Sequence, residues 1–96
     1  MSRPVVVIGS GGFGREAVEV IQAAQSAGAD LALLGFVDDD GAAPGRAVLE
    51  RAGIPYLGGL GALLRLGAGY SYIVGIGDPD RRAATVDQLE GTGLTA

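Results

Sequence analysis

The sequence predicts an α/β fold, a three-layer sandwich in which helices cover both faces of a small parallel sheet of three or four strands. Short apolar runs of strand length alternate with segments of helical periodicity, which is the pattern of βαβ units. A glycine-rich turn joins the first apolar run to the first helical segment. With 96 residues, the chain is long enough for one small domain with a modest core.

The first strand is predicted over residues 4–8, where Val5, Val6, Val7 and Ile8 form a β-branched apolar run. Such a run is typical of a strand that is buried on both faces of a sheet. We therefore expect this strand at the centre of the sheet.

The turn after this strand has the spacing of a phosphate-binding loop. Gly9, Gly11 and Gly14 fit the pattern G-x-G-x-x-G, in which glycines permit a tight turn, a close approach of backbone to phosphate and close helix packing. The following helix directs unpaired N–H groups at the loop, where an anion is stabilised. We therefore predict a phosphate-bearing ligand. The alternative is a tight strand–helix turn without a ligand.

A helix and a second strand complete a right-handed βαβ unit. The helix is predicted over residues 15–25 and ends before Gly28, which favours a helix end. Its apolar residues recur at helical spacing and are expected in the core; they are Ala17, Val18, Ile21 and Ala24. Residues 31–37 form the second apolar run of strand length.

Shorter elements are predicted after the second strand. They are helical turns over 46–52, an edge strand over 54–59, a short helix over 60–66, a strand over 70–76 and a helix from 79 to about 90. Asp78 is the expected N-cap of the last helix, with Pro79 at its first position. This helix is expected to bury Ala83, Ala84, Val86 and Leu89.

The ends of the strands are expected to meet at one edge of the sheet. The first strand should lie between the second strand and the strand over 70–76, which places a ligand site outside their carboxyl ends. Asp38 and Asp39 follow the second strand, where an acidic residue accepts ribose hydroxyls in dinucleotide-binding folds. Acidic residues before a glycine also suit a solvated turn. Gly58 and Gly77 fall at the same edge.

The charge of the chain excludes several functions. The net charge is −4, and its seven basic residues are all arginines, scattered singly except for Arg81 and Arg82, which are expected on a solvated face. A nucleic-acid interface needs a concentrated basic surface, so we predict no nucleic-acid partner. The absence of lysine excludes a Walker A loop.

The sequence contains neither cysteine nor histidine. This excludes thiol nucleophiles, disulfides and zinc sites built on these residues, and we assign no catalytic residue and no metal ligand to the chain. Its apolar runs are shorter than the roughly 18 residues of a membrane span, and no secretory h-region follows the N-terminus. We therefore expect a cytoplasmic protein.

Four segments occur in the order and spacing of one protein family. They are VVVIGSGGFGREAVEVI, GFVDDD, GIPYLGG and YIVGIGDPDRR. To about Glu90, the chain resembles the N-terminal domain of bacterial sugar O-acyltransferases of the sialic-acid O-acetyltransferase (NeuD) type. UDP-amino-sugar N-acetyltransferases of bacterial glycan biosynthesis share this pattern.

The resemblance implies a Rossmann-like domain over residues 1–90 that binds a nucleotide-sugar, with a UDP-sugar expected. Residues 91–96 would be a tail or the start of a linker. In the family, a left-handed β-helix of hexapeptide repeats binds acetyl-CoA, carries a catalytic histidine and forms a trimer. The chain has no histidine and no such repeat. We therefore expect no cofactor in this chain and catalysis in a C-terminal β-helix domain that it lacks.

The resemblance also implies the substrate-binding residues of the chain. The residues that match the loop at the nucleotide-sugar phosphates are Gly9, Ser10, Gly11, Gly12, Phe13 and Gly14. Asp38 and Asp39 match an acidic pair near the nucleoside, and Gly58 and Gly77 match glycines along the same edge.

Two other functions stay open from the sequence. An NAD-binding fragment of an oxidoreductase shares the glycine loop and the acidic strand end. A stand-alone regulatory module that senses a nucleotide is the second alternative. The protein to which this domain belongs is expected to be an acetyltransferase, whereas the 96-residue chain alone is not expected to catalyse the transfer.

Overall fold

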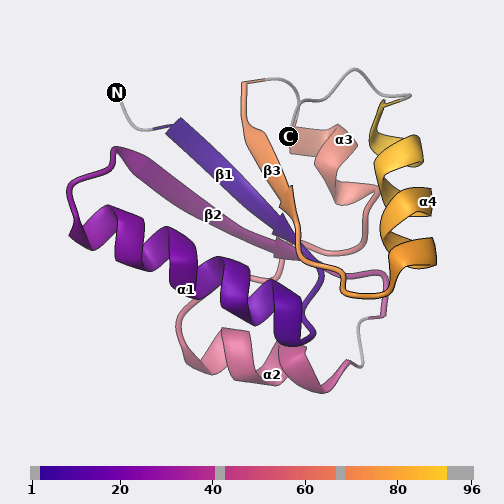
Figure 1. The fold of residues 1–96 in the computed structure, drawn as a ribbon, viewed down its shortest axis with the longest axis horizontal. Helices are drawn as coiled ribbons and strands as arrows, with labels where there is room; N and C mark the ends of the chain where they lie inside the picture. Colours follow the sequence, from indigo (N-terminus) through magenta and orange to yellow (C-terminus); the bar gives the residue numbers. More distant parts are fainter. Residues whose placement is uncertain (1–2, 41–42, 67–68, 91–96) are drawn as a thin grey trace.

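The sheet of the protein is parallel and has three strands. The computed structural model describes residues 3–40, 43–66 and 69–90. The elements in this part of the chain are β1 (Arg3–Ile8), α1 (Gly12–Ser26), β2 (Leu31–Val37), α2 (Pro44–Arg51), α3 (Ala62–Leu66), β3 (Ser71–Val74) and α4 (Pro79–Glu90). The strands lie in the order β2-β1-β3 (Figure 1). The predicted Rossmann-like α/β fold and the central place of the first strand are confirmed.

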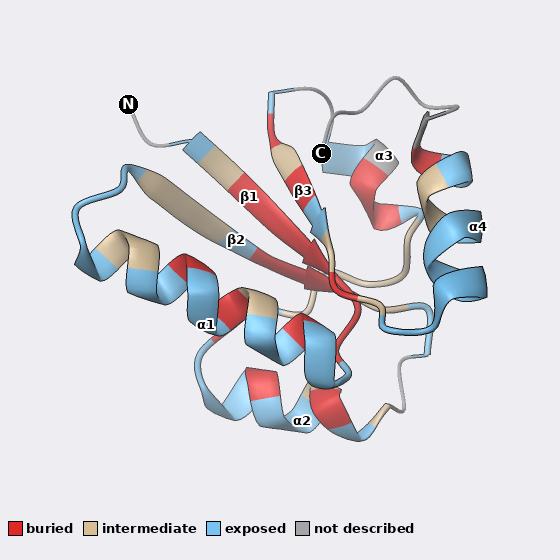
Figure 2. Cartoon of the chain, in the orientation of Figure 1, coloured by how far each residue is buried: buried red, intermediate tan, exposed pale blue. Residues whose placement is uncertain are grey.

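Helices cover both faces of this sheet. Helices α1 and α2 lie on one face, and α3 and α4 lie on the other (Figure 1). Because successive side chains of a strand point to opposite faces, β1 contributes to two cores. Val5 and Val7 pack with residues of α1 and α2, whereas Val6 and Ile8 pack with residues of α3 and α4. Figure 2 shows that buried residues concentrate in the sheet and on helix sides that face it.

The predicted edge strand over residues 54–59 is wrong. The segment follows β2 in parallel, with one isolated bridge between Phe36 and Tyr56. Pro55 has no N–H group to donate, and Gly53 and Gly58 have positive φ angles of 84° and 115°. The segment still exchanges backbone hydrogen bonds with the β2 edge, from the Pro55 carbonyl oxygen, which accepts the Phe36 N–H at 2.9 Å, to the Gly58 carbonyl oxygen, which accepts the Asp38 N–H at 3.0 Å.

The last helix is less buried than its pattern predicts. Ala83 and Ala84 are exposed and Val86 is half-buried, whereas Leu89 is buried. Helix α4 packs beside the edge strand β3 of a narrow sheet. Only a narrow stripe of its residues is therefore in contact with the rest of the described protein. The N-cap prediction is confirmed, because the backbone N–H of Asp80 donates to Asp78 Oδ1 at 3.2 Å. Residues 91–96 lie outside the described residues.

No helix within residues 3–40, 43–66 and 69–90 combines the length and the apolar character that a membrane crossing requires.

Tyr70 links the start of β3 to α3 and gives the fold a dependence on alkaline pH. It is 7% exposed, and its hydroxyl donates to the carbonyl oxygen of Leu63 at 2.8 Å. Burial raises the pKa of Tyr70 above its ordinary value of 10.0. The folded state therefore holds the phenolic proton more tightly than the unfolded state, and this contribution to stability is complete below pH 10 and is lost as pH rises through the folded pKa.

We expect Tyr70→Phe to lower the free energy of unfolding by about 1 kcal/mol near neutral pH, because the hydrogen bond to Leu63 is lost. Above about pH 10 the wild-type chain also loses the contribution of the buried hydroxyl, so the difference between the two chains should shrink. Urea unfolding of both chains at neutral and alkaline pH measures this difference. A difference that does not change with pH would contradict the assignment.

Candidate functional site

The carboxyl ends of the three strands surround a hollow of about 120 Å³, which we call the glycine-loop hollow. One wall is the turn between β1 and α1, with Gly9, Ser10, Gly11, Gly12 and Phe13. The opposite wall is the turn after β3, residues 75–78, and Asp38 and Arg81 complete the lining. The structure thus brings seven of the ten predicted site residues to one place.

Ser10 and Asp38 hold the glycine loop against the end of β2. Ser10 is fully buried, and its hydroxyl and backbone N–H both donate to Asp38 Oδ2, at 2.6 and 2.9 Å. The other carboxylate oxygen, Oδ1, accepts the N–H of Asp40 at 2.9 Å. Asp38 therefore has a structural role in fixing the loop, in addition to the ribose contact that the sequence predicts.

We expect Ser10→Ala to lower the free energy of unfolding by about 1.5–3 kcal/mol, because a hydrogen bond to a charged group is removed inside the protein. Chemical denaturation measures the change. Ser26→Ala, at the exposed end of α1, is the matched control and should change stability by less than about 0.5 kcal/mol. Equal effects of the two variants would show that the Ser10–Asp38 contact does not hold the loop.

Two further glycines explain why the loop can lie so close to its neighbours. A Cβ atom on Gly14 would overlap the carbonyl oxygen of Gly9 and lie 2.7 Å from the Gly9 carbonyl carbon. A Cβ atom on Gly75 would lie 2.5 Å from Gly14 Cα. The first turn of α1 therefore contacts the ends of β1 and β3 through backbone alone. Gly14 packs against the backbone of Gly9, and it does not line the hollow.

Gly11 and Gly12 face open space instead. A Cβ atom on either residue would have no protein atom within 4 Å, and both line the glycine-loop hollow. Gly11 is the N-cap of α1, and no side chain caps this helix end. The first N–H groups of α1 are therefore not satisfied by a capping side chain and suit an anionic group.

Asp39 lies on a second, smaller hollow of about 50 Å³, which we call the Asp39 hollow. This hollow shares Gly9, Asp38, Ile76 and Arg81 with the first. Asp39 Oδ1 accepts the backbone N–H of Leu60 at 2.7 Å, which fixes the turn before α3. Asp38 and Asp39 thus both lie at this edge of the sheet, and each already accepts a hydrogen bond from a backbone N–H.

Gly58 does not line either hollow. Its carbonyl oxygen accepts the N–H of Asp38 at 3.0 Å, so Gly58 contacts the site through the backbone of Asp38. Gly77 does line the glycine-loop hollow, where the ring of Phe13 lies against it. The structure therefore places Gly77 at the site and Gly58 behind it.

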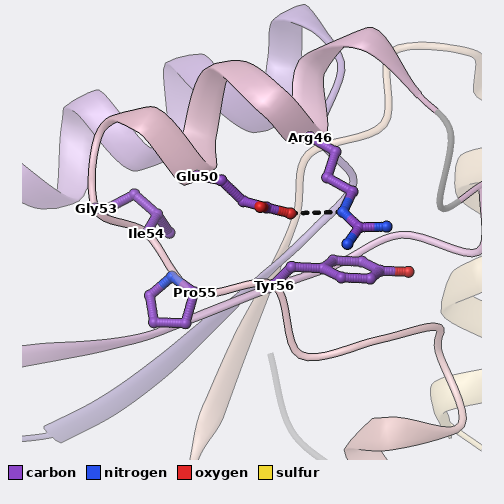
Figure 3. A pocket seen from close by; sticks show the side chains of 6 residues that line it. All are labelled: Arg46, Glu50, Gly53, Ile54, Pro55 and Tyr56. Carbon is purple, nitrogen blue, oxygen red and sulfur yellow. Dashed lines mark hydrogen bonds and ion pairs between the residues drawn. The ribbon is translucent and has the colours of Figure 1, made fainter.

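A third depression, of about 380 Å³, lies between α2 and the segment that follows it (Figure 3). Arg46 lies over the ring of Tyr56, 4.0 Å from its centroid, and donates to Glu50. The hydrogen bond to Glu50 raises the pKa of Arg46. This depression is away from the glycine loop, and its Tyr56 hydroxyl donates to the Asp38 carbonyl oxygen at 2.9 Å. Tyr56 of this depression thus holds the backbone of Asp38 without lining the glycine-loop hollow.

Four residues of the hollow are absent from the predicted site, and Arg81 is the basic one among them; the others are Gly75, Ile76 and Asp78. Arg81 is exposed, as expected, and it also lines both hollows from the first turn of α4. The available signal was its place just after the N-cap of a helix that starts at a strand end, which directs that turn toward the ligand edge.

Within residues 3–40, 43–66 and 69–90, no group of three or more His, Cys, Asp or Glu residues is arranged to hold a metal ion.

Comparison with known proteins gives one match. Residues 4–89 match the family model described as the PglD N-terminal domain. No curated protein and no solved structure matches the chain significantly. The matched range includes both hollows and all ten predicted site residues.

Proposed function

We propose that the chain, which belongs to the family of PglD N-terminal domains, binds the nucleotide-sugar substrate of a sugar acetyltransferase. Membership confirms the resemblance to PglD/NeuD-type acetyltransferases that the four sequence motifs indicate. The ligand we favour is a UDP-sugar.

The observation that carries this proposal is the meeting of the glycine loop, Asp38 and Gly77 around one hollow at the carboxyl ends of the strands. In open α/β sheets, nucleotides bind at this edge. The uncapped start of α1 offers N–H groups to phosphate, and the acidic residues offer acceptors to hydroxyl groups.

The size of the hollow supports a ligand that is held at one end. Its volume of about 120 Å³ is well below the roughly 300–1,000 Å³ of sites that enclose a small molecule. We infer that this hollow takes only part of the ligand and that the sugar extends beyond it. The sugar therefore stays accessible to a second domain.

This arrangement suits a division of labour within the proposed enzyme. The N-terminal domain holds the nucleotide end, and a C-terminal β-helix domain supplies the acetyl-CoA site, the catalytic base and the trimer interface. Holding the acceptor in place lowers the entropic cost of acetyl transfer. The chain itself has no histidine to act as the base.

Calorimetric titration of residues 1–96 with UDP, a UDP-amino-sugar, NAD and acetyl-CoA tests the proposal. We expect heat of binding with the UDP compounds and none with NAD or acetyl-CoA. Binding of NAD alone would contradict the proposal and favour the oxidoreductase fragment. Binding of free nucleotides without a preference for the UDP-sugar would favour the regulatory module.

A further inference from the structure

Arg81 is the one basic side chain among the described residues that lines the glycine-loop hollow. It also lines the Asp39 hollow, where it lies with Gly9, Asp38 and Thr85. The residue therefore stands where the two hollows meet, above the carboxyl end of β1. No other basic residue of the described chain lines either hollow.

The guanidinium group of Arg81 has no hydrogen-bond or ion-pair partner among the described residues. Its backbone carbonyl oxygen accepts the Thr85 hydroxyl at 2.8 Å, but its side chain has no hydrogen bond or ion pair with a described residue. Arg46 differs in this respect, because its side chain donates to Glu50. Arg81 thus keeps its donors for another group.

The carboxylates around Arg81 already have donors from the protein. Asp38 accepts from Ser10, Asp39 from the N–H of Leu60, and Asp78 from the N–H of Asp80. Three carboxylates and one guanidinium line the two hollows, so the site carries a negative excess that repels a phosphate. The N–H groups at the start of α1 offset part of this charge, and Arg81 is the one cationic group of the described residues beside the hollows that can add a direct contact to phosphate.

We propose that Arg81 binds the diphosphate of the ligand and selects diphosphate-bearing ligands over uncharged nucleosides, an inference that rests on the proposed function. Its planar group donates two parallel hydrogen bonds to phosphate oxygens, which a lysine cannot do. Because the residue reaches both hollows, it fixes the diphosphate at the junction. The specificity of the site thus comes from α4 as well as from the glycine loop.

The test compares Arg81→Ala with Arg82→Ala. Both arginines are exposed, but Arg82 lines neither hollow. Residues 1–96 of each chain are titrated with UDP, inorganic pyrophosphate and uridine. We expect Arg81→Ala to weaken UDP and pyrophosphate about 10- to 100-fold, the range for the loss of a charge-assisted hydrogen bond, and to leave uridine unchanged. Arg81→Lys should recover only part of the loss, and Arg82→Ala should match the wild type. Circular dichroism confirms that each variant is folded.

The outcomes separate this inference from the proposed function. If the wild type binds the UDP-sugar and Arg81→Ala binds UDP equally well, the role of Arg81 is overturned and the proposed function stands. If the wild type binds pyrophosphate through Arg81 but no UDP compound, the proposed function fails and the diphosphate contact stands. Equal losses in Arg81→Ala and Arg82→Ala indicate general attraction of anions and overturn the inference, as does a wild type that binds none of these ligands.

Discussion

Gly14→Ala is expected to lower the free energy of unfolding by about 2 kcal/mol, although alanine is the better helix former. In an ordinary helix the change would stabilise the chain by up to about 1 kcal/mol. At Gly14 the added Cβ atom would overlap the carbonyl oxygen of Gly9, which belongs to the backbone of the turn. Since the backbone of a tight turn cannot move as a side chain does, the cost of overpacking exceeds the gain in propensity.

Gly12→Ala is the matched control for this prediction. Gly12 is in the first turn of the same helix, and a Cβ atom there would have no protein atom within 4 Å. We expect this variant to be as stable as the wild type or up to about 1 kcal/mol more stable. Urea unfolding, followed by circular dichroism, measures both. Similar stabilities of the two variants would show that α1 does not contact the turn as closely as the structure indicates.

The layers of the fold could be predicted because their signals are local. The run from Leu31 to Val37 is apolar throughout, and β2 has these bounds. The helical spacing of Val18 and Ile21 places both in the core, where they are buried. Periodicity within a segment reports which side of that segment meets the core, and it needs no knowledge of the neighbours.

The pairing of residues 54–59 and the burial of α4 could not be predicted in this way. The apolar run at Ile54 has the composition of a strand, but with positive φ angles at Gly53 and Gly58 it forms one bridge and a few backbone hydrogen bonds along β2 in place of a full strand. Ala83 has the spacing of a core residue, yet it is exposed, because no other element of the described residues covers that side of α4. Strand pairing and helix burial both depend on which other elements lie against the segment. The residues of the segment alone do not show this.

The site was predictable in outline and not in its contacts. The motif identified the loop from Gly9 to Gly14, but the need for glycine at Gly45 depends on a distant residue. A Cβ atom on Gly45 would overlap the carbonyl oxygen of Ser10, which precedes it by a strand and a helix. The tether between Ser10 and Asp38 likewise joins two turns that are distant in sequence. Such requirements become visible only when the sheet brings the turns together.

Gly11→Val is expected to weaken binding of a UDP-sugar about 100-fold or more while the fold survives. The Gly11 backbone is extended, with φ −74° and ψ −167°, which a β-branched residue adopts without strain. A Cβ atom there meets no other part of the described protein within 4 Å, and Gly11 lines the hollow, so we expect the new side chain to occupy space beside the ligand. It then separates the phosphate from the first N–H groups of α1, and the loss of two charge-assisted hydrogen bonds is about 100-fold or more.

Gly61→Val separates this effect from a general effect of valine in a turn. Gly61 also has no protein atom within 4 Å of a Cβ position, and it lies before α3, outside both hollows. We expect this variant to bind the UDP-sugar as the wild type does. For Gly11→Val, thermal unfolding should show a change of less than about 1 kcal/mol, the usual cost of an unfavourable N-cap residue. Because Gly14→Ala damages the fold and Gly11→Val only the binding, unchanged affinity in a folded Gly11→Val chain would mean that the ligand does not contact the loop.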